Sequence, residues 1–264
     1  MSAHRDKVAD LAWRNECEGW LALGSHAAKK APFRLELFHG IVCVWWQGTP
    51  GDMENYLLLP PAYNGDLEAA LLDLQPAIRR TRSATILRCL TAEESHDWRR
   101  TLSRCQFFLA DTALLMACPL EGFAGCPGAN RQIIVSPVET PAQYEAACQL
   151  VQRVFNNPVE LTQFFANPEL TRLYAAWQDG QVIASATLWP FGGTAGVYSV
   201  ATDPLFRYQG VASAVVERLL IDAFKLGFAW ATLRTTDNLF PVYQACGFQP
   251  AGRVSRWIHL RQGQ

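Results

Sequence analysis

A short loop between a strand and a helix carries the residues best suited to bind an anion. Arg207, Gly210 and Ala212 follow a β-like run that ends at Pro204, and an apolar-rich helix begins directly after them. The first N–H groups of a helix have no partner within it, and the helix dipole adds partial positive charge there. Small residues let a phosphate approach closely, and an arginine adds a fork of donors. The spacing therefore predicts that this loop holds the pyrophosphate of a nucleotide-like cofactor.

This pattern differs from two common phosphate-binding loops. The Gly-Lys-Ser/Thr ending of a Walker loop is missing, and so is the G-x-G-x-x-G fingerprint of dinucleotide-binding folds. An Arg-x-x-Gly-x-Ala spacing alone arises often by chance, so an ordinary strand-to-helix turn is the alternative. The apolar strand before the loop and the immediate start of the helix favour the anion site.

A second motif lies further along the chain. Residues 235–248 combine the end of a strand, a turn that contains Asn238, and a short helix that ends in Tyr243-x-x-x-Gly247-Phe248. Together with the Arg207 loop, this segment resembles the GNAT superfamily of N-acetyltransferases, whose hallmark is Arg/Gln-x-x-Gly-x-Gly/Ala after a strand. The resemblance covers residues 131–260 and implies acetyl-CoA as a co-substrate.

The resemblance also implies where acetyl-CoA would lie. In the family it occupies a V-shaped gap between two splayed parallel strands, with the pyrophosphate on the loop and the pantetheine arm bonded to the strand before it. Here residues 198–202 would supply the pantetheine contacts, chiefly through backbone groups. The expected cofactor-binding residues are Val200, Ala201, Thr202, Arg207, Tyr208, Gln209, Gly210, Val211, Ala212, Ser213 and Asn238. Asn238 is equally suited to form the turn or to cap a helix.

The resemblance gives Tyr243 the role of general acid. When an amine attacks the thioester carbonyl, the departing CoA thiolate needs a proton, and a phenol within hydrogen-bond reach can donate it. The alternative is a tyrosine that packs between helix and sheet.

The general base is less clear from the residues. Many relatives carry a glutamate on the strand before the loop, whereas residues 196–202 contain no carboxylate. A water held by backbone carbonyls, with help from Tyr198 or Ser199, is one expectation. Glu160 and Asp203 are the alternatives.

Two further features could belong to the site or to the core. Trp189-Pro190-Phe191 precedes the central strand, where it could face substrate, although core packing or a domain interface is the simpler interpretation. His259 lies in the last strand, and we expect it to be structural or exposed.

The two halves of the chain repeat one pattern. Residues 85–88 and residues 231–234 are strands that end in arginine, and each is followed by a helix, a Cys-x-Phe segment and a closing strand. The turn in the first half that corresponds to the Arg207 loop, residues 62–67, has no arginine and no second small residue. Asp66 would repel a phosphate there, so only the second half is expected to bind the cofactor.

The pattern therefore predicts an α/β protein with two GNAT-like modules, each a mixed, mostly antiparallel sheet flanked by helices. The Gly-, Ala- and Pro-rich residues 122–130 mark the boundary. We expect a degenerate domain without a cofactor loop over residues 1–125 and a catalytic domain over residues 131–264. Periodicity predicts helices over 6–23, 66–78, 93–103, 141–155, 161–166, 211–226 and 239–246, with strands between them and a strand pair over 105–118.

Composition limits the classes of function. The chain has 264 residues, half of them hydrophobic, and a net charge of −1, so a clustered basic face for nucleic acid is not expected. The charged first residues and the lack of a long apolar run predict a cytoplasmic protein with no membrane partner. The eight cysteines lack metal-ligand spacing, so no metal site and mostly buried free thiols are expected.

We therefore expect an acetyl-CoA-dependent N-acetyltransferase that transfers acetyl directly to an amine of a small molecule or peptide. The degenerate first half would shape the acceptor site or hold the pair together. A non-catalytic acyl-CoA sensor or scaffold is the alternative, and a different acyl chain is a weaker one. The acceptor and a possible homodimer are left open by the sequence.

Overall fold

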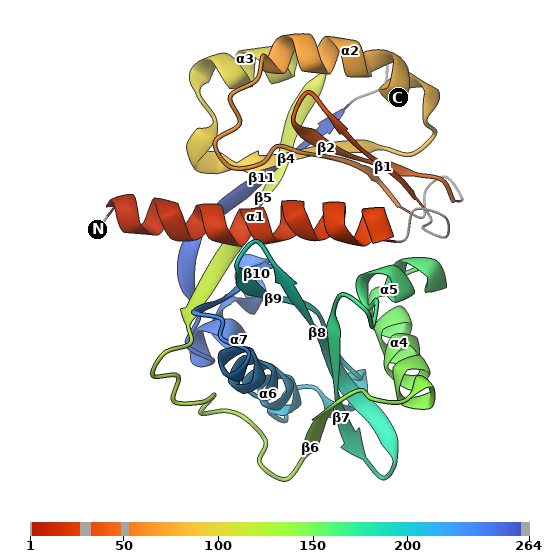
Figure 1. Cartoon of the computed structure of the whole chain (residues 1–264), viewed down its shortest axis with the longest axis vertical. Coiled ribbons are helices and arrows are strands. Elements are labelled where there is room, and N and C mark those ends of the chain that lie inside the picture. Colours follow the sequence, from red (N-terminus) through yellow and green to blue (C-terminus); the bar gives the residue numbers. More distant parts are fainter. Residues whose placement is uncertain (1, 27–32, 49–52, 260–264) are drawn as a thin grey trace.

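The computed structural model describes residues 2–26, 33–48 and 53–259, and one open sheet runs through both halves (Figure 1). Its 11 strands follow the order β1-β2-β3-β4-β11-β5-β10-β9-β8-β7-β6. The α/β class is as expected, but the two modules share this sheet instead of having one each. They share it because two long strands, β5 and β11, pair at the centre of the sheet and join the halves.

The first half contributes strands β1 to β4, which come first in that order, the central strand β5, and three helices. These elements are α1 (Ser2–His26), β1 (Phe33–Phe38), β2 (Ile41–Trp46), β3 (Asn55–Leu58), α2 (Leu67–Arg80), β4 (Thr85–Leu90), α3 (His96–Arg104) and β5 (Phe107–Pro119).

The second half supplies the other six strands and four helices. They are β6 (Ile134–Pro137), α4 (Pro141–Phe155), α5 (Val159–Phe165), β7 (Arg172–Gln178), β8 (Gln181–Phe191), β9 (Thr194–Thr202), α6 (Val211–Lys225), β10 (Trp230–Thr235), α7 (Phe240–Ala245) and β11 (Gln249–His259).

The final strand of each half completes the sheet of the other half. β11 pairs with β4, and β5 pairs with β10, while β5 and β11 pair with each other along most of their length. The predicted strand pair over residues 105–118 is therefore wrong. A neighbour on each side holds residues 107–119 as one extended strand.

Helix α1 crosses the sheet between the two halves and contacts both (Figure 1). The indole Nε1 of buried Trp13 donates to the Leu59 carbonyl in the first half, at 2.6 Å. The amide Nδ2 of buried Asn15 donates to the carbonyls of Trp189 and Phe191 in the second half, at 3.0 and 2.8 Å. The helix therefore fixes the two halves relative to each other.

Separate apolar clusters lie on the two faces of the sheet. One packs α6 against β8, β9 and β10, and another packs α2 against β3 and β4. A third lies beneath α1 and is rich in aromatic residues. Each of the eight cysteines lies within the described residues and is a buried thiol that is not part of a disulfide.

Two searches of the described residues complete the picture. None of the helices there is both long enough and apolar enough to cross a membrane. Within residues 2–26, 33–48 and 53–259 there is also no group of three or more His, Cys, Asp or Glu side chains placed to hold a metal ion.

Candidate active site

The parallel strands β9 and β10 separate soon after they begin. They pair only at Ala195 opposite Ala231 and at Gly196 opposite Thr232. Beyond that point Ser199 adopts a left-handed φ of 50°, and the register between β8 and β9 shifts at the same place. Such a bulge bends a strand away from its neighbour. The two strands therefore leave a gap between them. Residues 200–202, which the sequence predicts to contact a pantetheine arm, lie on the β9 side of this gap.

Helix α6 begins at the mouth of this gap. Gly210 is its N-cap, with a φ of 73° and no side chain to accept from the first N–H groups. The first turn carries no acidic residue. The open amides and the helix dipole make this end attractive to an anion, as the sequence predicts for Val211, Ala212 and Ser213.

The structure gives Gly210 a second reason to be glycine. A Cβ there would lie 2.3 Å from the Gly128 carbonyl oxygen and 3.0 Å from the Asn130 nitrogen. Asn130 also donates its backbone N–H to the Gly210 carbonyl at 3.1 Å and its side-chain amide to the Gln209 carbonyl at 3.1 Å. The segment between the halves therefore packs on the back of the loop, and the size of Gly210 reflects that contact as well.

The remaining loop residues face outward. Tyr208 is fully exposed at a φ of 61°, and Arg207 is exposed, with its Nε donating to the Thr202 carbonyl at 3.3 Å. The side-chain amide of Gln209 donates to the Leu205 carbonyl at 2.9 Å. Arg207 is thus tied to the end of β9, beside the start of α6.

Tyr243 lies on α7, directly after β10. Its ring is half-buried and meets Phe248 edge-on at 6.1 Å. Burial, followed by the neighbouring Cys246, raises the pKa of Tyr243 to about 12. The hydroxyl therefore stays protonated at ordinary pH, which a proton donor requires. Asn238 is exposed and its Oδ1 accepts from the Thr236 hydroxyl, which supports the turn-forming alternative for that residue.

The candidate bases differ in their surroundings. Asp203 accepts from the Leu205 N–H at 3.0 Å, as the cap of a short 3-10 turn. Tyr198 is buried, and burial raises its pKa well above the usual value. The side chain of Glu160 lies outside the described residues. His259 is buried at the far end of β11, with its ring 5.1 Å from that of Phe107.

A pocket of about 270 Å³ lies between the halves and reaches the bulge at Ser199. We call it the inter-half pocket. Its walls include Trp20 from α1, Tyr56 from β3 and Trp189 from β8. Trp189 stacks on Tyr198 at 4.2 Å and donates its indole N–H to the Phe165 carbonyl at 3.0 Å. Trp189 thus serves both the core and this pocket.

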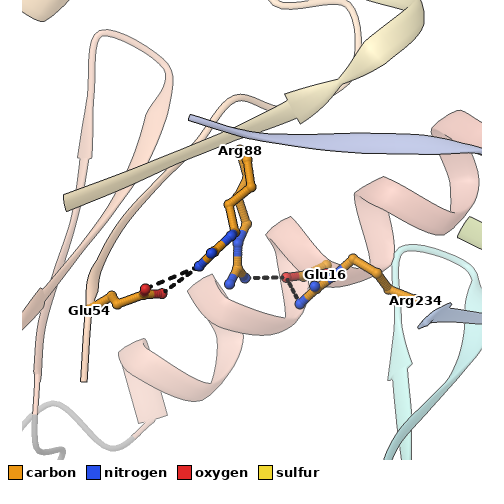
Figure 2. Close-up of polar contacts among 5 residues, drawn as sticks. Glu16, Glu54, Arg88 and Arg234 are labelled. Carbon is orange, nitrogen blue, oxygen red and sulfur yellow. Dashed lines mark hydrogen bonds and ion pairs between the residues drawn. The ribbon is translucent and has the colours of Figure 1, made fainter. Parts of the chain in front are cut away.

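Three charged side chains, which the sequence did not identify as site residues, meet in the inter-half pocket (Figure 2). Buried Glu16 of α1 accepts from Arg88 Nη1 at 3.1 Å, and from Arg234 Nε and Nη2 at 2.9 and 3.2 Å. The two arginines end the strand segments 85–88 and 231–234, whose likeness is visible in the sequence. Glu16 gives no such signal, because it is one of several polar residues on a predicted helix.

The electrostatics of Glu16 follow from this pairing. Burial disfavours its charged form, but the charges of Arg234 and Arg88 and the hydrogen bonds from both outweigh that effect. The pKa of Glu16 therefore lies below its usual range, and the side chain is a carboxylate at neutral pH. Its oxygens are engaged on both sides, so it is a poor candidate for a proton acceptor.

Comparison with known proteins agrees with this geometry. The sequence model of the Acetyltransferase (GNAT) family matches residues 140–248. A comparison with curated proteins finds no match. A GCN5-related N-acetyltransferase from Kribbella flavida superposes with a TM-score of 0.69 at 16% identity, covering 92% of this chain and 96% of that one.

Two other solved structures show the same fold over most of the chain. One is a GCN5-related N-acetyltransferase from Sphaerobacter thermophilus, with a TM-score of 0.62, 14% identity, and coverage of 95% of this chain and 92% of that one. The other is described as a tandem GNAT protein from the clavulanic acid biosynthesis pathway, with a TM-score of 0.64, 13% identity, and coverage of 92% and 94%. The GNAT acetyltransferase family model therefore matches residues 140–248, and solved GNAT structures share the fold over 92 to 95% of the chain.

Proposed function

We propose that the second half binds acetyl-CoA between β9 and β10 and transfers the acetyl group directly to an amine held in the inter-half pocket. The observation that carries the proposal is the gap itself. β9 loses its parallel partner after Gly196, and an uncapped helix start lies at the mouth of the gap. The inter-half pocket reaches Ser199 at the same bulge, from the other side of the sheet.

The residues fit such a co-substrate. Backbone groups of Val200 and Thr202 can pair with the amides of a pantetheine arm as a strand would, and the first turn of α6 can hold the pyrophosphate. Arg207, Tyr208 and Gln209 complete the loop, with Arg207 supplying positive charge. Acetyl-CoA, when bound, supplies the activated acetyl group and a thiolate leaving group.

The reaction requires two proton transfers. A new C–N bond forms as the C–S bond breaks, the amine gives up one proton, and the sulfur takes one. Tyr243, on α7 directly after β10, donates the proton to the sulfur. Glu16 is held by two arginines, so we propose that water beside the Ser199 bulge accepts the amine proton.

The alternative function is a non-catalytic acyl-CoA sensor. The absence of a carboxylate on β9 favours it, because residues 194–202 carry none. A sensor would keep the gap and the helix start but would release no thiol from acetyl-CoA in the presence of amines.

Tyr243→Phe separates catalysis from binding. The variant keeps the edge contact with Phe248 and removes only the hydroxyl, so we expect kcat to fall by about 100-fold, the scale of general acid catalysis. Thiol release measured against a panel of amines, with acetyl-CoA affinity measured by calorimetry, checks both values. Unchanged turnover would remove Tyr243 from the mechanism. Tight binding of acetyl-CoA without thiol release in the presence of any amine would favour the sensor.

A further inference from the structure

We infer that the acceptor is an amine that also carries a carboxylate, and that Arg88 and Arg234 hold this carboxylate in the inter-half pocket. The inference rests on the proposed function, because it names the class of amine that the second half would acetylate. It assigns the first half a direct part in substrate binding, through Arg88.

The charges in the pocket do not balance. Two guanidinium groups share one carboxylate, that of Glu16, which leaves one positive charge in excess among the three (Figure 2). Glu54 is the next acidic group near Arg88, but it accepts from Arg256 Nη1 at 3.1 and 3.4 Å. Arg256 in turn also bonds Asp111 at 3.1 and 3.2 Å. Glu54 and Asp111 thus balance the wider cluster, but of these carboxylates only Glu16 lines the pocket and accepts from Arg88 and Arg234.

Arg88 is also incompletely bonded. Its side chain is almost fully buried, with the residue 8% exposed, and its Nε has no hydrogen-bond partner in the described residues. The guanidinium lies 4.2 Å over the ring of Tyr56, which fixes its plane. A buried charged donor without a partner is costly, and a bound carboxylate would relieve that cost.

The pocket places such a ligand beside the transfer site. Arg234 lies on β10 and Ser199 on β9, so the charged cluster and the gap meet where the two strands part. The volume of about 270 Å³ suits a molecule of amino-acid size. Trp20, Phe165 and Trp189 provide apolar wall for its body.

The two guanidinium groups on the pocket wall explain why the ligand needs both functional groups. An amine alone enters water as an ammonium ion, and its charge would add to that of the arginines. A carboxylate on the same molecule can accept from Arg88 Nε, which has no partner in the described residues, and leaves the amine to face the gap. A phosphate could meet the same guanidinium groups, so the test includes a phosphate-bearing amine.

The test compares amino acids with their carboxamides in the intact protein. Alanine and phenylalanine are paired with alaninamide and phenylalaninamide, and O-phosphoethanolamine is the phosphate arm. Thiol release at saturating acetyl-CoA gives kcat/KM for each compound. We expect each acid to exceed its amide by at least about 100-fold, since a site built for a charged group rejects the ligand that lacks it.

Arg88→Gln should abolish this preference for the acid. The variant leaves Glu16 and Arg234 as a balanced pair, so the fold should persist. Arg34→Gln is the control: Arg34 lies on β1, pairs with Glu36 at 3.3 Å and is not part of the pocket wall, so its loss should leave the acid preference unchanged. If Arg88→Gln does not fold, the comparison of acids with amides in the native chain decides alone.

Each outcome is decisive. Equal or better turnover of the amides overturns the inference while the proposed function stands, and so does a preference for O-phosphoethanolamine. If no compound is acetylated, calorimetry with the protein loaded with CoA must still show tighter binding of acids than of amides, or the inference fails. Failure of acetyl-CoA itself to bind would instead overturn the proposed function.

Discussion

The two parallel strand pairs of the sheet are built alike but finish differently. β3 and β4 stay paired from Asn55 opposite Thr85 to Leu58 opposite Arg88, and the Leu59 N–H then donates to the Arg88 carbonyl at 3.0 Å. β9 and β10 pair at only two positions and then part at the Ser199 bulge. The same topology therefore leaves a gap between the parallel strands in one half only, which is where we propose that the pantetheine arm binds.

The helices that follow the two first strands differ in the same sense. Asp66 caps α2 by accepting from the Ala69 N–H at 3.0 Å, and Glu68 follows in the first turn. α6 has Gly210 and Ala212 at the corresponding positions and no side-chain cap. In the first half the carboxylate of Asp66 therefore occupies the place of an anion. On the proposed function, cofactor binding therefore depends on both an open strand pair and an open helix start.

The sharpest way to break this contrast is to give α6 the acidic start of α2. Ala212→Glu places a carboxylate where Glu68 stands in α2. The helix itself tolerates the change, because an acidic residue favours a helix N-terminus. Repulsion between this carboxylate and the pyrophosphate should weaken acetyl-CoA binding by about 100-fold or more. Ala212→Gln has nearly the same size without the charge and should bind much more tightly than the glutamate variant. Equal calorimetric affinities for the two variants would place the pyrophosphate elsewhere.

A smaller effect is expected at the bulge. Ser199 has a left-handed φ, which a β-branched residue adopts poorly. Ser199→Val should therefore lower the free energy of unfolding by about 1 kcal/mol, whereas Ser199→Gly should lower it little or not at all. Urea titration of both variants measures the difference. A valine variant as stable as the glycine variant would mean that β9 is not bulged at this residue in solution.

The smallest effect is expected from the reverse exchange in the first half. Asp66→Gly combined with Glu68→Ala gives α2 the start of α6. Replacing an aspartate N-cap by glycine should lower the free energy of unfolding by only roughly 0.5 kcal/mol or less. The variant should gain no second acetyl-CoA site, because β3 and β4 remain paired. A second calorimetric binding event would show that the acidic helix start alone closes the first half.

Much of the fold was readable from the sequence because its signals are local. The helix after Gly210 and the repeated strand segments 85–88 and 231–234 depend on turn residues and periodicity, and both are present. The exchange of β5 and β11 between the halves was not readable. It depends on which long strand pairs with which, and either pairing satisfies the same alternation of side chains.

The candidate site also has residues that the sequence predicts and residues that only the fold brings together. The Arg207 loop and Tyr243 follow sequence motifs, and the structure places them at the two strands that part. Glu16, Arg88 and Arg234 come from a helix and two strands far apart in the chain, and only the fold brings them together. The bulge at Ser199 has no signal either, because serine is an ordinary strand residue in sequence terms.

The number of acetyl-CoA molecules bound per chain tests the central claim most directly. Calorimetric titration of the intact protein should give one site, which Ala212→Glu removes and the Asp66→Gly, Glu68→Ala variant leaves unchanged. Two sites per chain, or one site that survives Ala212→Glu at full affinity, would contradict the assignment of the cofactor to the gap between β9 and β10.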